Sequence, residues 1–458
     1  MTAEIAMKSI DRQRPVLERI AEQIWQNPEL GFEEYKASGW IADELERNGF
    51  QVERGVVNIP TAVKATYGEG HPIIGLLGEY DCLPGLSQKT KPEKDPVVEG
   101  APGHACGHNL LGVAHMGAAI AIKEELQARG LKGTIIFYGC PAEEGGSAKS
   151  YMARDGAFDE LDLSFHFHPG NVNTVGISGT AICQGKFHFH GVTAHPATNP
   201  QDGRSALDAI ELMNVASNYL REHVGKDVSI SYIITDGGKA PNMIPDEASV
   251  WYNLRADEKD DVMDVYERIK RIAAGAAMMT DTTFTEEFLG CVYNPLNNEE
   301  LQKVLYQAFE AVPAEELSPE DIDYINALNE ANPKIWESNC KRYNIPAKTP
   351  YLEDLLPLFY NRGSTDVGDV NHICAGVSFR TMCYPMGVQA HTWSATAITN
   401  HPFARKGMIR GAKILAWSCL KIFEDNSICE RAKAEFQEEI KEHPYRASLP
   451  NTPPKNIF

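Results

Sequence analysis

The chain has 458 residues, of which 43% are hydrophobic and 23% are charged, and its formal net charge is −20. This length predicts two domains, the composition is that of a soluble globular protein, and the acidic balance argues against nucleic acids and anionic membranes as partners. The N-terminus lacks a signal-peptide pattern, no apolar run is long enough to span a bilayer, and the 10 cysteines include no C-x-x-C pair, so we expect a cytoplasmic protein with reduced thiols.

An apolar strand near the start of the chain runs into acidic residues. The spacing of apolar residues predicts four elements, namely helices at about residues 4–25 and 33–48 and strands at about 63–66 and 73–78. The last of these strands is almost wholly apolar, which is typical of a strand buried on both faces of a parallel sheet. It ends in Glu79 and Asp81, and open α/β sheets place their sites at such strand ends. The alternative is that the two carboxylates only cap a turn.

The stretch from Gly103 to Asn109 holds the thiol of Cys106 and the imidazoles of His104 and His108 within a few residues. Its glycines allow the backbone to bend tightly, and the apolar run at 110–122 predicts a buried helix with His108 at its mouth. A thiolate beside imidazoles suits a transition metal, zinc first. A buried free cysteine beside solvated histidines would give the same pattern, so this stretch alone leaves both interpretations open.

Two further strands end in possible metal ligands. They are expected at about residues 134–139 and 161–168. The first runs into Glu143 and Glu144, and adjacent carboxylates can divide the work, one binding a metal while the other serves as a base. The second ends in His166 and His168, which share one face of the strand because strand side chains alternate. Together the strand ends offer more ligands than a single closed zinc site needs.

The pattern changes after about residue 183, where the strands become half-exposed. The expected elements are a strand at about 186–191, a helix at 202–223, strands at 228–234 and 248–255, and a helix at 260–276. This order suggests an α+β unit inserted into the first domain, with a half-exposed sheet edge suited to dimerisation. Beyond it we expect mixed helix and loop at 310–355 and an apolar helix at 407–420.

Taken in order, these motifs resemble the co-catalytic metallopeptidases, a family that includes aminoacylases, carboxypeptidase G and hippurate hydrolase. The resemblance runs from about residue 10 to 420 and is greatest for the branch with a cysteine ligand, in particular amidohydrolases similar to the B-type subunit of aminobenzoyl-glutamate hydrolase. It rests on residues 79–87, 103–108, 139–144, 168–169, 191–196 and 241–245 and on His391. It implies an α/β catalytic domain, with helices on both faces of a mixed, mostly parallel sheet, formed by residues 1–182 and 295–458. An α+β lid and dimerisation domain would be inserted at 183–294.

The resemblance also implies a role for each matching residue. Two divalent metal ions, zinc or manganese, would be bridged by Cys106 and further held by His108, Glu144, His168 and His391. Glu143 would be the general base on the attacking water, and Asp81 would buttress the site. Two rival ligands stay open, His166 in place of His168 and His401 in place of His391.

Three residues of the inserted domain would act on the substrate. His195 would reach the active site of the partner subunit in a homodimer and stabilise the oxyanion there, while Asn242 and Arg255 would contact the substrate. The chemistry agrees with this set of roles, because an amide needs an activated water, a polarised carbonyl and a proton for the leaving amine.

The sequence therefore predicts metal-dependent hydrolysis of the amide bond of an N-acyl or N-aroyl amino acid resembling aminobenzoyl-glutamate, or of a small dipeptide-like amide. One alternative is a dipeptidase with the same site. Another is a non-catalytic paralogue that binds small amides or acts as a partner subunit, against which the presence of Glu143 argues. A structural zinc protein is the third, and it leaves the excess of carboxylates unexplained.

Overall fold

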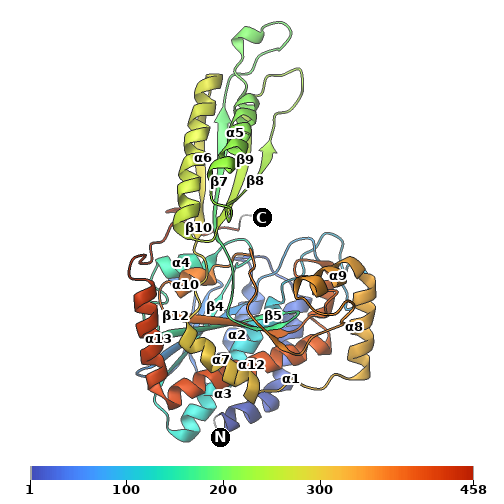
Figure 1. Ribbon diagram of the computed structural model, residues 1–458, viewed down its shortest axis with the longest axis vertical. Helices are drawn as coiled ribbons and strands as arrows, with labels where there is room; N and C mark the ends of the chain where they lie inside the picture. The colour runs from blue at the N-terminus through green and yellow to red at the C-terminus, as the bar shows by residue number, and fades with distance from the viewer. Residues whose placement is uncertain (1–2, 457–458) are drawn as a thin grey trace.

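A computed structural model describes residues 3–456, which form a large α/β domain and a narrower α+β domain that projects from it (Figure 1). The large domain is built on one eight-stranded sheet. Its strands lie in the order β1 (Gln51–Arg54), β2 (Val63–Glu69), β4 (Gly133–Cys140), β3 (Ile73–Glu79), β5 (Leu163–Gly170), β12 (Ala375–Met382), β6 (Asn173–Val175) and β11 (Leu355–Leu356). The four central strands β4, β3, β5 and β12 are parallel, while β2 and β6 pair antiparallel with their inner neighbours. The predicted mixed, mostly parallel sheet is thus confirmed.

Helices cover both faces of this sheet. They are α1 (Glu4–Gln26), α2 (Tyr35–Arg47), α3 (His108–Arg129), α4 (Ala148–Arg154), α7 (Glu299–Ala311), α8 (Pro319–Ala331), α9 (Pro333–Arg342), α10 (Val367–Asn371), α11 (Trp393–Ile398), α12 (Pro402–Glu424) and α13 (Asn426–Glu439). One core lies between the sheet and helices α1, α3 and α12 and contains Leu76 and Phe137. A second core on the opposite face contains Leu77 and Tyr138. Successive residues of β3 and β4 alternate between two buried faces, and for this reason both strands are almost wholly apolar.

The projecting domain is a four-stranded antiparallel sheet with two long helices on one face (Figure 1). Its elements are β7 (Ala181–His190), α5 (Ala206–Leu220), β8 (Ser229–Asp236), β9 (Glu247–Ala256), α6 (Lys259–Thr280) and β10 (Thr283–Val292), and the strand order is β10-β7-β9-β8. The sequence did not predict β10, where two adjacent glutamates and a bulge between Phe288 and Gly290 interrupt the alternation. It also did not predict β12 of the large domain.

One edge of the projecting sheet carries exposed apolar side chains. The edge strand β8 exposes Ile233 (60%) and Ile234 (41%), and the neighbouring helix α5 exposes Val215 (50%) and Tyr219 (66%). An unpaired strand edge flanked by apolar side chains is a surface suited to association with a second copy. The described helices include none that is long and apolar enough to cross a membrane.

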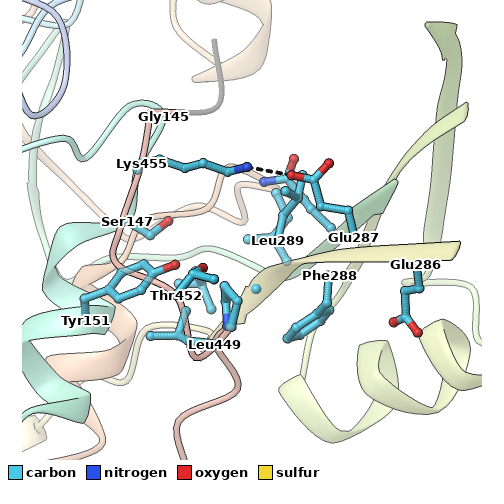
Figure 2. Close-up of a pocket in the computed structure, with 16 residues that line it drawn as sticks. Gly145, Ser147, Tyr151, Glu286, Glu287, Phe288, Leu289, Leu449, Thr452 and Lys455 are labelled. Carbon is cyan, nitrogen blue, oxygen red and sulfur yellow. Dashed lines mark hydrogen bonds and ion pairs between the residues drawn. The ribbon is translucent and has the colours of Figure 1, made fainter. Parts of the chain in front are cut away.

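The C-terminal segment after α13 returns to the base of the projecting domain. The backbone N–H of Cys291 donates to the carbonyl of Ser448 at 2.7 Å, and the ammonium of Lys455 lies 2.6 Å from a carboxylate oxygen of Glu287. A cavity of about 310 Å³ lies between this segment, β10 and the loop after Glu144 (Figure 2). The C-terminal segment therefore ties the two domains together beside their connection.

Candidate metal centre

The sheet brings the predicted ligands to one edge. Because β3, β4 and β5 are parallel, the residues that follow them or end them, Asp81, Glu144 and His168, meet at the carboxyl ends of the strands. His108 begins α3, and the loop before this helix supplies Cys106. Gly107 between them has a left-handed backbone with φ of 84°, and an added Cβ would lie 2.4 Å from the hydroxyl of Tyr384.

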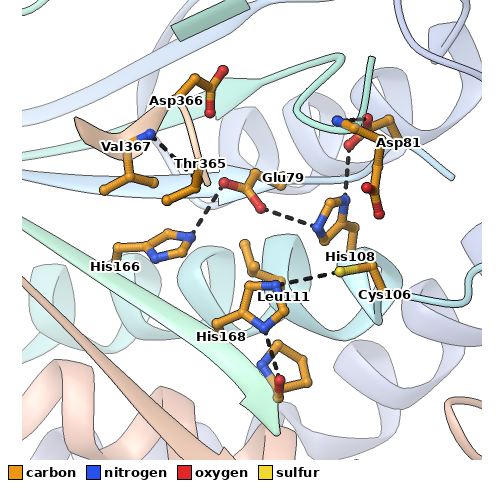
Figure 3. A network of polar contacts seen from close by, with 12 residues as sticks. Glu79, Asp81, Cys106, His108, Leu111, His166, His168, Thr365, Asp366 and Val367 are labelled. Atoms are coloured by element: carbon orange, nitrogen blue, oxygen red, sulfur yellow. Dashed lines mark hydrogen bonds and ion pairs between the residues drawn. The ribbon is translucent and has the colours of Figure 1, made fainter. Parts of the chain in front are cut away.

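Two groups of possible ligand atoms share one thiol. The first is Cys106, His108 and His168, the second is Cys106, Glu144 and His391, and within each group the ligand atoms all lie within 4.8 Å of one another. The sulfur of Cys106 is 3.5 Å from Nε2 of His168, as Figure 3 shows. A carboxylate oxygen of Glu144 is 3.3 Å from Nε2 of His391. The arrangement therefore provides two adjacent three-residue clusters that meet at Cys106.

Hydrogen bonds orient the imidazoles toward the thiol. Nδ1 of His108 lies 2.8 Å from Oδ1 of Asp81, and Nδ1 of His168 lies 2.7 Å from the carbonyl oxygen of Pro169 (Figure 3). The other oxygen of Asp81 accepts from the backbone N–H of Glu144 at 2.9 Å. Partners on Nδ1 leave Nε2 as the atom of each ring that can bind a metal, and such outer contacts are the usual way in which proteins fix a histidine ligand.

The donor set fits divalent cations. Burial raises the pKa of the Cys106 thiol, and burial raises the pKa of Glu144 to about 7. One carboxylate oxygen of Glu144 is buried and has no hydrogen-bond partner among residues 3–456. A metal ion beside these groups would compensate their anionic forms, and thiolate, imidazole and carboxylate are together the ligands that zinc takes in proteins.

A network of buried charges supports the centre from behind. The ammonium of Lys149 lies 2.7 Å from Glu79 and 2.5 Å from Asp366, and all three side chains are at most 1% exposed. Burial alone would raise the pKa of Glu79, but Lys149 and His166 outweigh it and hold this pKa well below its ordinary value. Glu79 also lies 3.2 Å from Nε2 of His108, so the charged network reaches a candidate ligand directly (Figure 3).

The geometry separates the two pairs of rival histidines. Nε2 of His166 lies 3.2 Å from Glu79, so this imidazole faces the buried charges and belongs to neither cluster around Cys106. His401 instead accepts from a backbone N–H at the start of α12, and its ring stacks on Tyr324 with a centroid separation of 4.1 Å. His168 and His391 are therefore the members of each pair that meet the thiol.

Glu143 lies next to the clusters, within ligand distance of Glu79 and His108. Burial and the neighbouring carboxylates of Glu79 and Glu144 raise its pKa well above the ordinary value. A carboxylate with a raised pKa accepts a proton more readily, which suits a general base.

The three predicted substrate residues of the projecting domain do not join the centre within one chain. His195 is exposed after β7, and its described hydrogen bonds stay inside its own turn. Asn242 is exposed on the neighbouring loop, which the backbone N–H of Ile244 ties to the carbonyl of Ala194 at 3.0 Å. Arg255 lies at the other end of β9 and donates to the carbonyl of Arg362 in the large domain at 3.1 Å.

Sequence comparison identifies the family. Residues 148–278 match the family model of the M20 peptidase dimerisation domain. The chain is 38% identical to the B-type subunit of the p-aminobenzoyl-glutamate hydrolase of Escherichia coli (strain K12), over 96% of this chain and 95% of that protein. The chain belongs to the M20 peptidase family.

The chain is also similar to a mouse dipeptidase in sequence and to a bacterial peptidase in fold. The Xaa-Arg dipeptidase of Mus musculus is 25% identical over 95% of this chain and 92% of its own length. A Bacillus subtilis structure described as a dinuclear metal binding peptidase of the M20 family superposes with a TM-score of 0.62 at 17% identity, over 91% of this chain and 99% of that one. As an M20 member, the chain is a metallohydrolase that acts on amide bonds, from a family with dinuclear metal sites.

Sequence reasoning missed two features near the centre. Lys149 carried no local signal, because its carboxylate partners Glu79 and Asp366 are far away in the sequence. Arg380 lies in the unpredicted strand β12, beside His168. The buried ion pairs of Lys149, which lies in α4, and the pairing of β12 with β5 show that each of these cations is close to the candidate ligands.

Proposed function

We propose that this M20 protein hydrolyses the amide bond between an acyl or aroyl group and an amino acid, in substrates resembling aminobenzoyl-glutamate. The observation that carries the proposal is the pair of clusters that share Cys106, with the carboxylate of Glu143 beside them. The 38% identical relative that is named for aminobenzoyl-glutamate hydrolysis supports this choice of substrate class. The Xaa-Arg dipeptidase relative is the reason to include dipeptides among the substrates tested.

In this proposal two divalent ions, zinc or manganese, would be held by Cys106, which both clusters share, together with His108, His168, Glu144 and His391. Bound there, the ions would supply Lewis acidity to the substrate carbonyl and lower the pKa of water. Glu143 accepts a proton from the attacking water and passes it to the leaving amine. Asp81 keeps His108 and the backbone of Glu144 in place through its two oxygens.

We further propose that the enzyme acts as a homodimer formed along β8 and α5. The exposed apolar residues on these elements and the match to a dimerisation domain support this surface. In such a dimer His195 would stabilise the oxyanion in the partner's site, and Asn242 and Arg255 would contact the substrate.

All ten cysteines are free and buried, which suits a reducing compartment and a cytoplasmic location.

The test is a hydrolysis screen. The purified protein, loaded with zinc or manganese, is offered aminobenzoyl-glutamate, N-benzoyl and N-acetyl amino acids, and dipeptides, and amine release is measured. We expect turnover of N-acyl or N-aroyl amino acids that stops with a chelator and returns with added metal. Turnover of dipeptides alone would make the protein a dipeptidase, and a metal-loaded protein that hydrolyses none of these amides would refute the proposal.

A further inference from the structure

An arginine without a counter-ion lies beside the candidate metal centre. Arg380 of β12 is paired with His168 of β5 in parallel register, so the two side chains leave the same face of the sheet, from strands about 4.8 Å apart. Gly170 makes room for it, because a Cβ added there would lie 3.2 Å from Cδ of Arg380. The guanidinium is therefore held against the strand end that carries His168.

Within residues 3–456 Arg380 has no carboxylate partner. Its guanidinium also makes no side-chain hydrogen bond in this part of the chain. Burial and the nearby guanidinium of Arg342 lower the pKa of Arg380, although its ordinary value is high enough to leave it charged. Arg380 is half-buried, charges withdrawn from water in proteins are normally paired, and this chain has 63 acidic residues against 43 basic ones. An unpaired arginine here is unexpected unless a ligand supplies the anion.

A second cation lies on the same side. The exposed guanidinium of Arg342 stacks over the ring of Phe359 with a separation of 4.9 Å and donates to the amide oxygen of Asn361 at 3.3 Å. Arg380, Phe359 and Asn361 line one small recess together with Ser178. The recess thus combines polar and aromatic groups with the guanidinium of Arg380, the residue in register with His168.

We propose that Arg380, assisted by Arg342, binds a carboxylate of the substrate and so positions its amide bond over the two clusters. The planar guanidinium can hold a carboxylate through two parallel hydrogen bonds, which a lysine cannot imitate. This inference rests on the proposed function and deepens it, because it makes the enzyme selective for amides that carry a carboxylate. The carboxylate can be the α-carboxylate of the released amino acid or one on its side chain, and matched substrates distinguish them.

The test compares Arg380→Gln with the wild type on three substrates: N-benzoylglutamate, N-benzoylglutamine and the α-amide of N-benzoylglutamate. Arg410→Gln is the control, because Arg410 is also partly buried but stacks on Phe309 and donates to the carbonyl of Val312, away from the centre. We expect Arg380→Gln to lower kcat/KM for N-benzoylglutamate on the order of 10²-fold, with metal content and Tm close to those of the control.

N-benzoylglutamine and the α-amide each lack one of the two carboxylates of N-benzoylglutamate, so they identify the carboxylate that Arg380 binds. If Arg380 binds the α-carboxylate, Arg380→Gln still lowers kcat/KM for N-benzoylglutamine but lowers it less than about threefold for the α-amide. If Arg380 binds the side-chain carboxylate, kcat/KM falls for the α-amide and changes less than about threefold for N-benzoylglutamine. Arg380→Lys should recover part of the loss, because it keeps the charge without the planar fork. Equal losses on all three substrates, or no loss on any, would overturn the proposal.

A binding measurement separates this inference from the proposed function. Calorimetry of N-benzoylglutamate with the metal-loaded Glu143→Gln protein requires no turnover. A dissociation constant that rises at least tenfold when Arg380→Gln is added supports the recess even if the wild type hydrolyses none of the amides in the screen. An unchanged dissociation constant would refute the role of Arg380 whatever the activity.

Discussion

Replacing Lys149 with Met tests the buried network behind the candidate metal centre. The ammonium of Lys149 contacts Glu79 at 2.7 Å and Asp366 at 2.5 Å, and none of the three side chains is more than 1% exposed. Burial lowers the pKa of Lys149, but the two carboxylates outweigh this effect and raise it well above the ordinary value, so the lysine is charged. Methionine has a similar shape but no charge, and it leaves two buried carboxylates without their cation. Removal of one partner from a buried ion pair costs about 3–5 kcal/mol.

The matched control is Lys413→Met, which removes an ion pair with Asp11 of similar length, 2.6 Å, from a more exposed position. Exposed pairs contribute about 0–1 kcal/mol. At about 2 °C per kcal/mol for a domain of this size, Tm should fall by about 6–10 °C for Lys149→Met and by at most about 2 °C for Lys413→Met. Thermal unfolding followed by circular dichroism measures both variants. Equal, small shifts for the two would refute the claim that the network carries this much stability.

Glu143→Gln should keep the metal content of the wild type and lower the rate by about 10²–10⁴-fold, because an amide cannot shuttle a proton. Glu144→Gln should instead lose metal. Metal analysis that gives the opposite result would reverse the roles of Glu143 and Glu144. His195→Ala and Glu143→Gln protomers should each be inactive, and mixing them should restore up to about half of the wild-type activity through one complete site of two. If confirmed heterodimers stay inactive, His195 does not act across the interface. Ile233→Asp, which places a charge on the exposed β8 edge, should convert dimers to monomers in analytical ultracentrifugation. A dimer that persists would place the interface elsewhere.

Much of the candidate centre could be predicted because its residues follow strands. The apolar run before Glu79 and the one before Glu143 each indicated a strand buried on both faces, and parallel strands bring their carboxyl ends to one edge. The short stretch around Cys106 provided ligands that are close in sequence and therefore close in space. The structure places Cys106, Glu144 and His168 at that same edge.

The remaining features depend on contacts between distant segments. Lys149 and Asp366 are separated by 217 positions, and neither shows a local pattern that would predict their pairing. Arg380 becomes notable only once β12 is seen to pair with β5 in register with His168. Strand β10 escaped prediction because its bulge and adjacent glutamates break the alternation on which strand recognition depends. The place of His195 in a site depends on a second copy of the chain, which one sequence does not specify.

The central claim is that Cys106 joins two metal ions in one site. Its most direct test is the metal content per chain, measured by elemental analysis after removal of loosely bound ions, for the wild type and for Cys106→Ala. Since Cys106 is shared by both clusters, we expect about two divalent ions per wild-type chain, and no more than one in a folded but inactive Cys106→Ala protein. Two ions retained in Cys106→Ala would contradict the bridging role, and a fully active wild type without bound metal would contradict the account as a whole.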